Sequence, residues 1–298
     1  MPASKIKNKK IDAILACPTC KHHLIKHKEY YLCENCNLKF PKDNNLNILI
    51  SDEMKELSSH FQSKEKDIKE RIKNLIPYPD ARLWTRKSKR AISNTLRNIN
   101  PDLENKIVIN IGSASERIFK KLFKPYNQII KIGIPHKGQI DIFGDAMKLP
   151  LKNNCLDLII SSSVMEHIPD PELAVSESFR VLKPGGKIYC EIPFMVGYHM
   201  IPHDYQRYTI QGIEKLFSRH NYKLIEKGIS SGPFTAYMLM IHHSVINIVP
   251  KGFLRFVLRI LLLWILLPFK YLDYLVENSK WAEIFACNFY YLGEKPPK

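Results

Sequence analysis

The chain has 298 residues, enough for one α/β core of ordinary size with smaller modules attached. Its 45 basic and 29 acidic side chains give a net charge of +16, which favours an anionic partner such as nucleic acid, a phospholipid surface or a phosphorylated substrate. The first residues do not resemble a signal peptide, so we expect a cytoplasmic protein, and a peripheral position at the inner membrane face stays open.

Two cysteine pairs occur within the first fifty residues. Cys17 and Cys20 form CPTC, Cys33 and Cys36 form CENC, and twelve residues separate the pairs. A two-residue gap lets both thiolates of a pair reach one ion, and four sulfurs complete a tetrahedral zinc site at about 2.3 Å each. Because no ligand position is left for water, we expect a structural Zn²⁺ and a zinc ribbon over residues 1–50.

Residues 14–50 resemble the short zinc ribbons of activator subunits of certain tRNA and protein methyltransferases, and those fused ahead of some bacterial methyltransferase domains. Two roles stay open for such a ribbon. Its lysines and histidines suit contact with RNA, whereas a docking module would pack on its own catalytic domain.

The next segment, 51–104, is predicted to be a helical connector that ends in a second helix over about 84–99. Beyond it, strand-like and helix-like runs alternate, with strands near 107–111, 127–134, 139–145, 156–163 and 185–194 and a helix over 171–182. This alternation indicates a doubly wound, mostly parallel sheet covered by helices on both faces.

The segment INIGSASER, residues 109–117, follows the first of these strands. In a doubly wound sheet a ligand binds outside the carboxyl ends of the strands, beside the first strand. The loop contains a single glycine, Gly112, where a dinucleotide loop carries two or three. A phosphate-free cofactor tolerates this composition better, because the additional glycines make room for a pyrophosphate.

The sequence that follows, GDAMKLPLKNNCLDLIISSSVMEHIPDPELAVSESFRVLKPGGKIYCEIPF, resembles the type 11 group of class I S-adenosylmethionine-dependent methyltransferases. The resemblance covers about residues 106–230. It implies an α/β fold, a Rossmann-like doubly wound sheet of seven mostly parallel strands, with S-adenosyl-L-methionine as the cofactor. Glu166 and His167 would wall the pocket. The cofactor-binding positions that it implies are Asn110, Gly112, Ser113, Ala114, Asp145, Ala146, Ser162 and Ser163.

The chain departs from the pattern of that group in three respects. The loop has Ala114 and Glu116 where glycines are common, and Asn110 stands in place of an acid. In addition, IIKIGIPHKG lacks the carboxylate that ends the second strand in the group and accepts the ribose hydroxyls. The nearest acid, Asp141, belongs to the next strand, so a non-catalytic scaffold that kept the fold is an alternative.

The segment GYHMIPHDYQRYTIQGIEKLF resembles an element of type 11 methyltransferases linked to cell-surface glycan or glycolipid assembly. Methyl transfer requires alignment of donor and acceptor and, for a hydroxyl acceptor, removal of a proton. We therefore expect His203 and Asp204 to be catalytic. Arg207, Tyr205 and His199 are predicted to bind the substrate, with packing as the alternative role of the tyrosine.

The last part of the chain is predicted to be an apolar, basic helical insertion over 231–284, followed by the final strand of the core and a tail over 285–298; the core itself covers 105–230. The insertion has no acid from Lys227 to Leu272. Its longest uncharged run, ILLLWILLPF, is too short to cross a bilayer, so it fits an anionic membrane interface, a buried cap or a dimer contact.

These features favour an S-adenosylmethionine-dependent methyltransferase that acts on a glycan or lipid-linked intermediate near the membrane surface. The alternatives are an rRNA or tRNA methyltransferase, supported by the ribbon and the positive charge, and the non-catalytic scaffold. The oligomeric state stays open.

Overall fold

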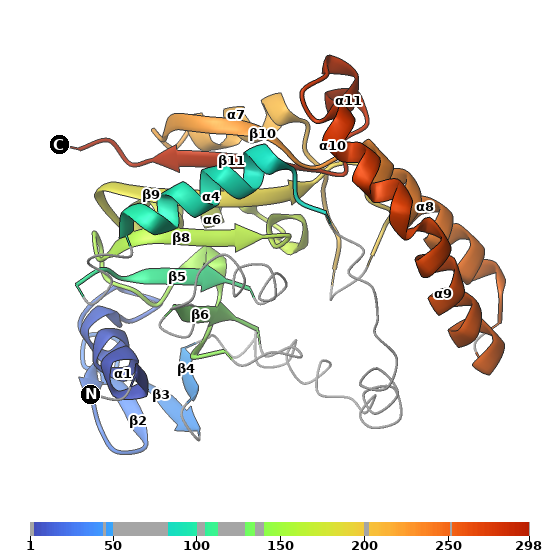
Figure 1. Ribbon diagram of the computed structural model, residues 1–298. Coiled ribbons are helices and arrows are strands. Elements are labelled where there is room, and N and C mark those ends of the chain that lie inside the picture. Colours follow the sequence, from blue (N-terminus) through green and yellow to red (C-terminus); the bar gives the residue numbers. More distant parts are fainter. Residues whose placement is uncertain are drawn as a thin grey trace.

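The computed structural model describes residues 3–43, 46–49, 83–99, 105–112, 129–134, 140–199, 203–250 and 252–297. Within these residues the protein is built on one eleven-stranded sheet, in the order β1-β2-β3-β4-β7-β6-β5-β8-β9-β11-β10 (Figure 1). The helical part of the connector predicted over 51–82 lies outside the described residues, whereas its second helix is present as α4 (Arg86–Ile99).

Seven of the strands form the predicted Rossmann-like core. Strands β7, β6, β5, β8 and β9 are parallel, and β11 runs antiparallel between β9 and β10. The order therefore reverses beside β5, as in a doubly wound sheet. The strands are β5 (Val108–Ile111), β6 (Ile130–Gly133), β7 (Ile142–Gly144), β8 (Leu156–Ser162), β9 (Leu182–Pro193), β10 (Lys223–Ser231) and β11 (Asn288–Glu294).

Helices cover both faces of this core, which explains why its strands are continuous apolar runs. On one face lies α4 (Figure 1), whose Ile92 and Leu96 belong to the same buried core cluster as Val108 and Ile160. On the other face lie α6 (Pro171–Val181) and α7 (Ile210–Ser218), whose buried residues join the core around Ile109 and Ile159. The Asp170 side chain caps α6 by accepting a hydrogen bond from the Leu173 amide.

The N-terminal region extends the same sheet and is not a separate body. It contains α1 (Ala3–Ile14), β1 (Ile25–Lys26), β2 (Tyr30–Cys33), β3 (Leu38–Asp43) and β4 (Leu46–Leu49), and β4 pairs in parallel with β7. The sheet is thus larger than the seven strands that the sequence predicts. The sequence did not reveal α1, because its few apolar residues stand among lysines and only their burial in the core explains the helix.

The ribbon is also attached to the core outside the sheet. The Ala16 amide donates to the carbonyl of Pro150 at 3.0 Å, and the Lys152 amide donates to the carbonyl of Ile14 at 2.9 Å. The ammonium of Lys21 forms an ion pair with Glu177 of α6 at 2.8 Å. These contacts match the docking role that the sequence left open for the ribbon.

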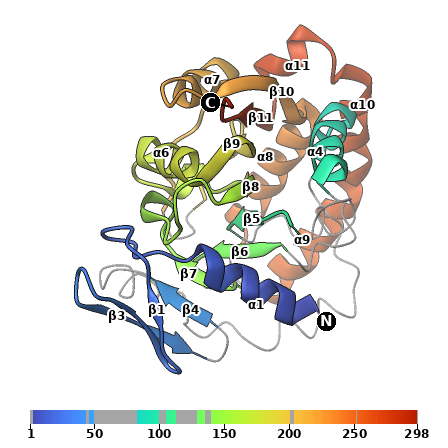
Figure 2. The ribbon, with the colours of Figure 1, turned by 90° about the vertical axis from the view of Figure 1, so that its left-hand side faces the viewer.

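The segment between β10 and β11 is helical. It contains α8 (Pro233–Ile248), α9 (Phe253–Leu266), η5 (Leu267–Leu272), α10 (Asp273–Val276) and α11 (Lys280–Ile284). Helices α8 and α9 lie beyond the carboxyl ends of the parallel strands (Figures 1 and 2). The buried carboxylate of Asp273 anchors α8 by accepting hydrogen bonds from the amides of Phe234 at 2.8 Å and Thr235 at 3.1 Å.

Candidate functional site

The turn after β5 is shaped by Gly112. Its φ is +77°, and its amide donates to the carbonyl of Ile132 in β6 at 2.8 Å. A Cβ added at this position would lie 2.6 Å from Cγ2 of Val164. Glycine is therefore required here by both conformation and space. Asn110, two residues earlier, is buried, whereas the predicted cofactor residues Ser113 and Ala114 lie outside the described residues.

The end of β8 carries the two predicted serines. The Ser162 hydroxyl donates to a carboxylate oxygen of Glu191 in β9 at 2.5 Å, so this side chain is engaged within the sheet. Ser163 has a φ of +53°, and its amide donates to the carbonyl of Glu191 at 3.0 Å. A positive φ at a residue other than glycine marks a sharp change of chain direction beside the Gly112 turn.

Asp145 and Ala146 lie at the end of β7. The Asp145 carboxylate accepts a hydrogen bond from the Met147 amide at 2.8 Å and caps the short helix η3 (Ala146–Lys148). Burial raises the pKa of this carboxyl group above its ordinary value. The group remains half-buried at the carboxyl edge of the sheet, beyond the last residue of the strand.

Asp141 is the acid nearest in sequence to the position of the missing ribose ligand. It lies at the amino ends of the parallel strands, whereas the predicted cofactor site is at their carboxyl ends. Its carboxylate accepts a hydrogen bond from the Lys131 amide at 2.7 Å and pairs with Lys7 at 2.7 Å. Both Lys131 and Asp141 are close to the amino ends of β6 and β7, because Ile132 pairs with Ile142. Among the described residues that follow β6, Ile134 supplies no carboxylate, and residues 135–139 lie outside the described part.

Residues 203–209 precede α7 (Ile210–Ser218) and contain the positions predicted to act on the acceptor. We call them the acceptor loop, and its central residue is Asp204. Its buried carboxylate forms an ion pair with the guanidinium of Arg207 and accepts a hydrogen bond from the His199 amide at 2.7 Å. The Arg207 hydrogen bonds lower the pKa of Asp204 to about 2, so it is a carboxylate at neutral pH. Arg207 also donates to the carbonyl of Val196 at 3.2 Å. This geometry gives both charged residues a clear structural role in the loop.

The other predicted acceptor residues stand beside this pair. The side chain of His203 is exposed and its ring centroid is 5.6 Å from that of Tyr205. Tyr205 is half exposed, and its amide donates to the carbonyl of Glu166 at 2.8 Å. The loop is therefore fixed to the segment that follows β8.

That segment contains a group that the sequence did not bring together. Glu166 and His167 belong to η4 (Met165–His167), and His199 follows β9, yet one ligand atom from each lies within 4.8 Å of the others. Glu166 is completely buried. The adjacent pair EH is visible in the sequence, but only the parallel pairing of β8 and β9 brings His199 to it.

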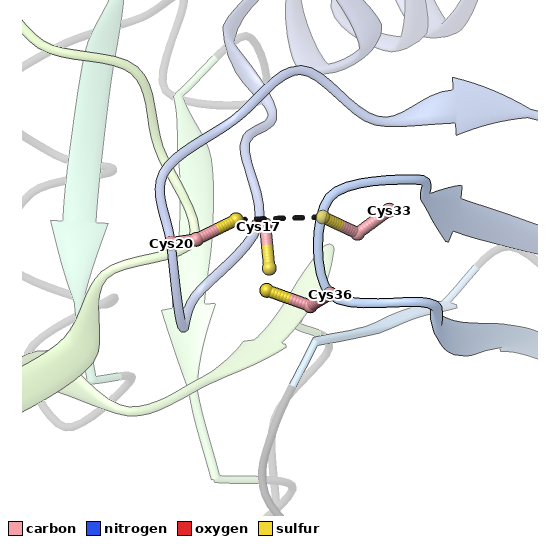
Figure 3. A group of neighbouring side chains, drawn as sticks. All are labelled: Cys17, Cys20, Cys33 and Cys36. Atoms are coloured by element: carbon pink, nitrogen blue, oxygen red, sulfur yellow. Dashed lines mark hydrogen bonds between the residues drawn. The ribbon is translucent and has the colours of Figure 1, made fainter.

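The four predicted zinc ligands do converge (Figure 3). The sulfurs of Cys17, Cys20, Cys33 and Cys36 lie within 4.8 Å of one another, and those of Cys20 and Cys33 are 3.4 Å apart. Cys17 and Cys20 follow α1, whereas Cys33 ends β2 and Cys36 lies in the turn before β3. This spacing fits four thiolates around one tetrahedral ion.

The helical insertion exposes a large apolar surface. On α9 the exposed side chains of Leu254, Leu261, Trp264 and Ile265 recur at helical spacing and form one stripe, which we call the α9 stripe. Arg259 is exposed on α9, whereas Lys270 is buried and adds no charge to the surface. Within the described residues, no helix combines the length and apolar character needed to cross a membrane.

The sequence and the fold are both similar to those of known methyltransferases. Residues 111–190 match the family described as a methyltransferase domain. A demethylmenaquinone methyltransferase of Anoxybacillus flavithermus is 31% identical over 81 residues, which are 26% of this chain and 34% of the relative. A ubiquinone/menaquinone biosynthesis C-methyltransferase of Ruegeria is 28% identical over 102 residues, 34% of this chain and 36% of the relative. The chain thus spans about a third of the length of these relatives.

Solved structures include a SAM-dependent methyltransferase from Archaeoglobus fulgidus, with a TM-score of 0.40 and 14% identity over 70% of this chain and 94% of that one. Another is a phosphoethanolamine N-methyltransferase 2 from Haemonchus contortus in complex with S-adenosyl-L-methionine. Its TM-score is 0.39 and its sequence identity 15%, over 65% of this chain and 49% of that one. Residues 111–190 are therefore similar to methyltransferase domains, and the strand order is that of a doubly wound, Rossmann-like sheet.

Proposed function

We propose that the protein transfers a methyl group from S-adenosyl-L-methionine to an acceptor. The observation that carries this proposal is the turn at Gly112, which combines a positive φ with close contact to Val164 beside the reversal point of the sheet. Ligands of doubly wound sheets bind at this point. The similarity of residues 111–190 to methyltransferase domains supports the same activity.

The proposed cofactor site combines the turn after β5 with the ends of β7 and β8. Gly112 would let the backbone approach the cofactor closely, because it has no side chain. Asp145 and Ala146, which follow β7, would face the adenine. The engagement of Ser162 by Glu191 favours a supporting role for that hydroxyl. The proposed set comprises Asn110, Gly112, Ser113, Ala114, Asp145, Ala146, Ser162 and Ser163.

On the acceptor side we propose that His203 handles a proton when the acceptor is a hydroxyl group, because its side chain is exposed beside Tyr205. Asp204 and Arg207 would position the loop through their ion pair. His199 and Tyr205 would line the acceptor pocket. A methyl-transfer assay with His203→Ala and Tyr205→Phe tests these roles, since only the histidine variant should lose turnover for a hydroxyl acceptor.

We further propose that the acceptor is lipophilic, a lipid-linked glycan or related intermediate, and is reached at an anionic membrane surface. The α9 stripe supports this proposal, because it exposes Leu254 by 64% and Ile265 by 66%. Arg259 is exposed on the same helix and would add positive charge toward lipid phosphates, whereas the guanidinium of Arg255 already donates to Asn247 at 2.8 Å. The quinone-related names of the relatives also refer to apolar acceptors.

Flotation with vesicles of phosphatidylglycerol and phosphatidylcholine tests the membrane proposal. The intact protein should float with anionic vesicles, and Leu261→Glu or Ile265→Glu should remain at the bottom of the gradient. Leu173→Glu is the matched control, because Leu173 is an exposed leucine on α6, far along the chain from the insertion. Binding to RNA without affinity for anionic vesicles would instead support the alternative of an RNA methyltransferase.

We also propose that the four cysteines hold a structural Zn²⁺. The sulfur geometry supports it, as does the location of the cluster between the turns of a ribbon that is itself part of the sheet. With four thiolates the ion would have no position open for a substrate, so its contribution is to the stability of the fold.

A further inference from the structure

We propose that Glu166, His167 and His199 form a second metal site, which binds one divalent transition-metal ion close to the turn at Gly112. Two imidazoles and one carboxylate are a common ligand set for such ions, and this set leaves coordination positions open. The site is separate from the cysteine cluster in both ligand type and place in the fold. It does not depend on the identity of the methyl acceptor.

Both histidine–carboxylate distances suit a shared ion. Nε2 of His167 lies 3.7 Å from Oε1 of Glu166, and Nε2 of His199 lies 4.0 Å from the same oxygen. An ion with bonds of about 2.1 Å can join two ligand atoms that are up to about 4.2 Å apart. The rings of the two histidines are 5.1 Å apart and nearly perpendicular, at 89°, so they approach the carboxylate from different directions.

The contacts of the Nδ1 atoms indicate which nitrogen of each histidine ring carries the proton. Nδ1 of His167 is 2.5 Å from the carbonyl oxygen of His203, which requires a proton on Nδ1. Nδ1 of His199 is 3.1 Å from the carbonyl oxygen of Gly197 and 3.5 Å from Oδ2 of Asp204, two acceptors that together favour a proton on Nδ1 over the single donor near it, Nη2 of Arg207 at 3.4 Å. In the neutral rings both Nε2 atoms then carry the lone pair that faces Glu166. Metal-binding histidines typically donate their other ring N–H to a carbonyl or carboxylate in this manner.

Nearby charges also fit a bound cation. Glu166 is completely buried, and a carboxylate in that setting requires positive charge or hydrogen bonds around it. The guanidinium of Arg207, which also interacts electrostatically with Glu166, is bonded to the carboxylate of Asp204, with Nη2 donating to Oδ2 at 2.7 Å. Asp204 in turn holds the His199 amide at 2.7 Å and so fixes one of the proposed ligands.

The position of the site gives the ion a defined neighbourhood. Val164 lies against Gly112, because a Cβ on Gly112 would meet its side chain. Glu166, the first proposed ligand, follows Val164 by two residues, so the site is close to the turn at Gly112. Tyr205 of the acceptor loop bonds to the Glu166 carbonyl. The open coordination positions would therefore suit an oxygen ligand of the acceptor, such as a hydroxyl or phosphate oxygen.

Cobalt(II) is the probe that separates the two metal sites. Protein with zinc retained in the ribbon, verified by elemental analysis, is titrated with Co²⁺ and followed by calorimetry and visible absorption. We expect one additional equivalent of cobalt and a spectrum without the strong near-ultraviolet bands of thiolate-bound cobalt. Failure to bind cobalt, or binding accompanied only by thiolate bands and zinc release, would overturn the proposal.

Three variants locate the ion. His199→Ala and Glu166→Gln should each lose the additional equivalent and retain the ribbon zinc. The histidine is partly exposed, which protects the test if the buried glutamate variant fails to fold. His203→Ala is the matched control, because His203 contributes a backbone carbonyl to His167 and no side-chain ligand. Unchanged cobalt stoichiometry in His199→Ala would contradict the site, and would leave ion pairing with protonated histidines as the explanation for the cluster.

Discussion

At the scale of single residues, Gly112 is the position that most directly links the sequence to a bound cofactor. The sequence identified it as the only glycine of INIGSASER, and the structure adds that a side chain there meets Val164. Its importance was predictable because tight turns at strand ends favour glycine. The contact with Val164 was not predictable, because it depends on the pairing of β5 with β8.

We predict that Gly112→Ala weakens S-adenosylmethionine binding by at least about a hundredfold, since a positive φ and a contact of 2.6 Å both oppose the methyl group. Isothermal titration calorimetry measures the affinity. Gly185→Ala is the control, because Gly185 has a φ of +78° and open space where its Cβ would lie. Equal affinity of the two variants would show that the turn does not contact the cofactor.

Asp204 yields a prediction about pH. Replacement by Asn should lower the free energy of unfolding at pH 7 by about 2–3 kcal/mol, because it leaves Arg207 without its charged partner. The pKa of Asp204 is lowered to about 2, so its contribution is complete above the unfolded-state pKa of about 3.9 and is lost as the pH falls toward 2.

Denaturant unfolding of Asp204→Asn and the parent protein between pH 7 and pH 3 measures this contribution. The difference between them should be constant down to about pH 5 and should shrink below pH 4. A difference that grows as the pH falls would contradict the role of the Asp204–Arg207 ion pair.

At the scale of elements, the alternation of apolar strands and helices predicted a doubly wound, mostly parallel sheet, and the resemblance to class I methyltransferases implied its seven strands. The sequence also placed the helical insertion over 231–284, before the final strand, and helix α11 ends at Ile284. The pairing of β4 with β7 was beyond sequence reasoning, because a four-residue strand carries no signal of its distant partner.

The shared sheet leads to a prediction for the ribbon. Cys33→Ser should lose the ribbon zinc and lower the melting temperature by about 5–10 °C, since β2 and β3 connect through β4 to the core. Differential scanning calorimetry should show one transition that moves as a whole. Cys155→Ser is the control, because Cys155 lies outside the cluster. A separate early transition, with the main one unchanged, would indicate that the ribbon unfolds independently.

At the scale of the whole molecule, the net charge of +16 agrees with an anionic surface as partner but does not choose between lipid and RNA. The fold favours lipid, because the ribbon packs on the core through Lys21 and Glu177, whereas the apolar side chains of α9 face solvent. The charge balance predicts an anionic partner, and the exposed α9 stripe supports the proposal that this partner is a lipid surface.

Association with anionic vesicles should combine attraction by the positive net charge with insertion of the apolar α9 stripe. We predict that raising the salt concentration from 0.05 to 0.5 M, at which charge–charge attraction is strongly screened, weakens vesicle binding by about tenfold or more without abolishing it. Sedimentation with vesicles of fixed composition measures the partition. Complete release by salt would assign binding to charge alone and contradict a role for the α9 stripe.

The central proposal is that this fold binds S-adenosylmethionine as a methyl donor. Calorimetric titration of the intact protein with this cofactor tests it most directly, because the measurement requires no knowledge of the acceptor. We predict binding of one equivalent at micromolar to submillimolar affinity and loss of that binding in Gly112→Ala. Absence of binding at millimolar cofactor, in protein that is folded and zinc-loaded, would contradict methyl transfer and leave a scaffold with a methyltransferase fold.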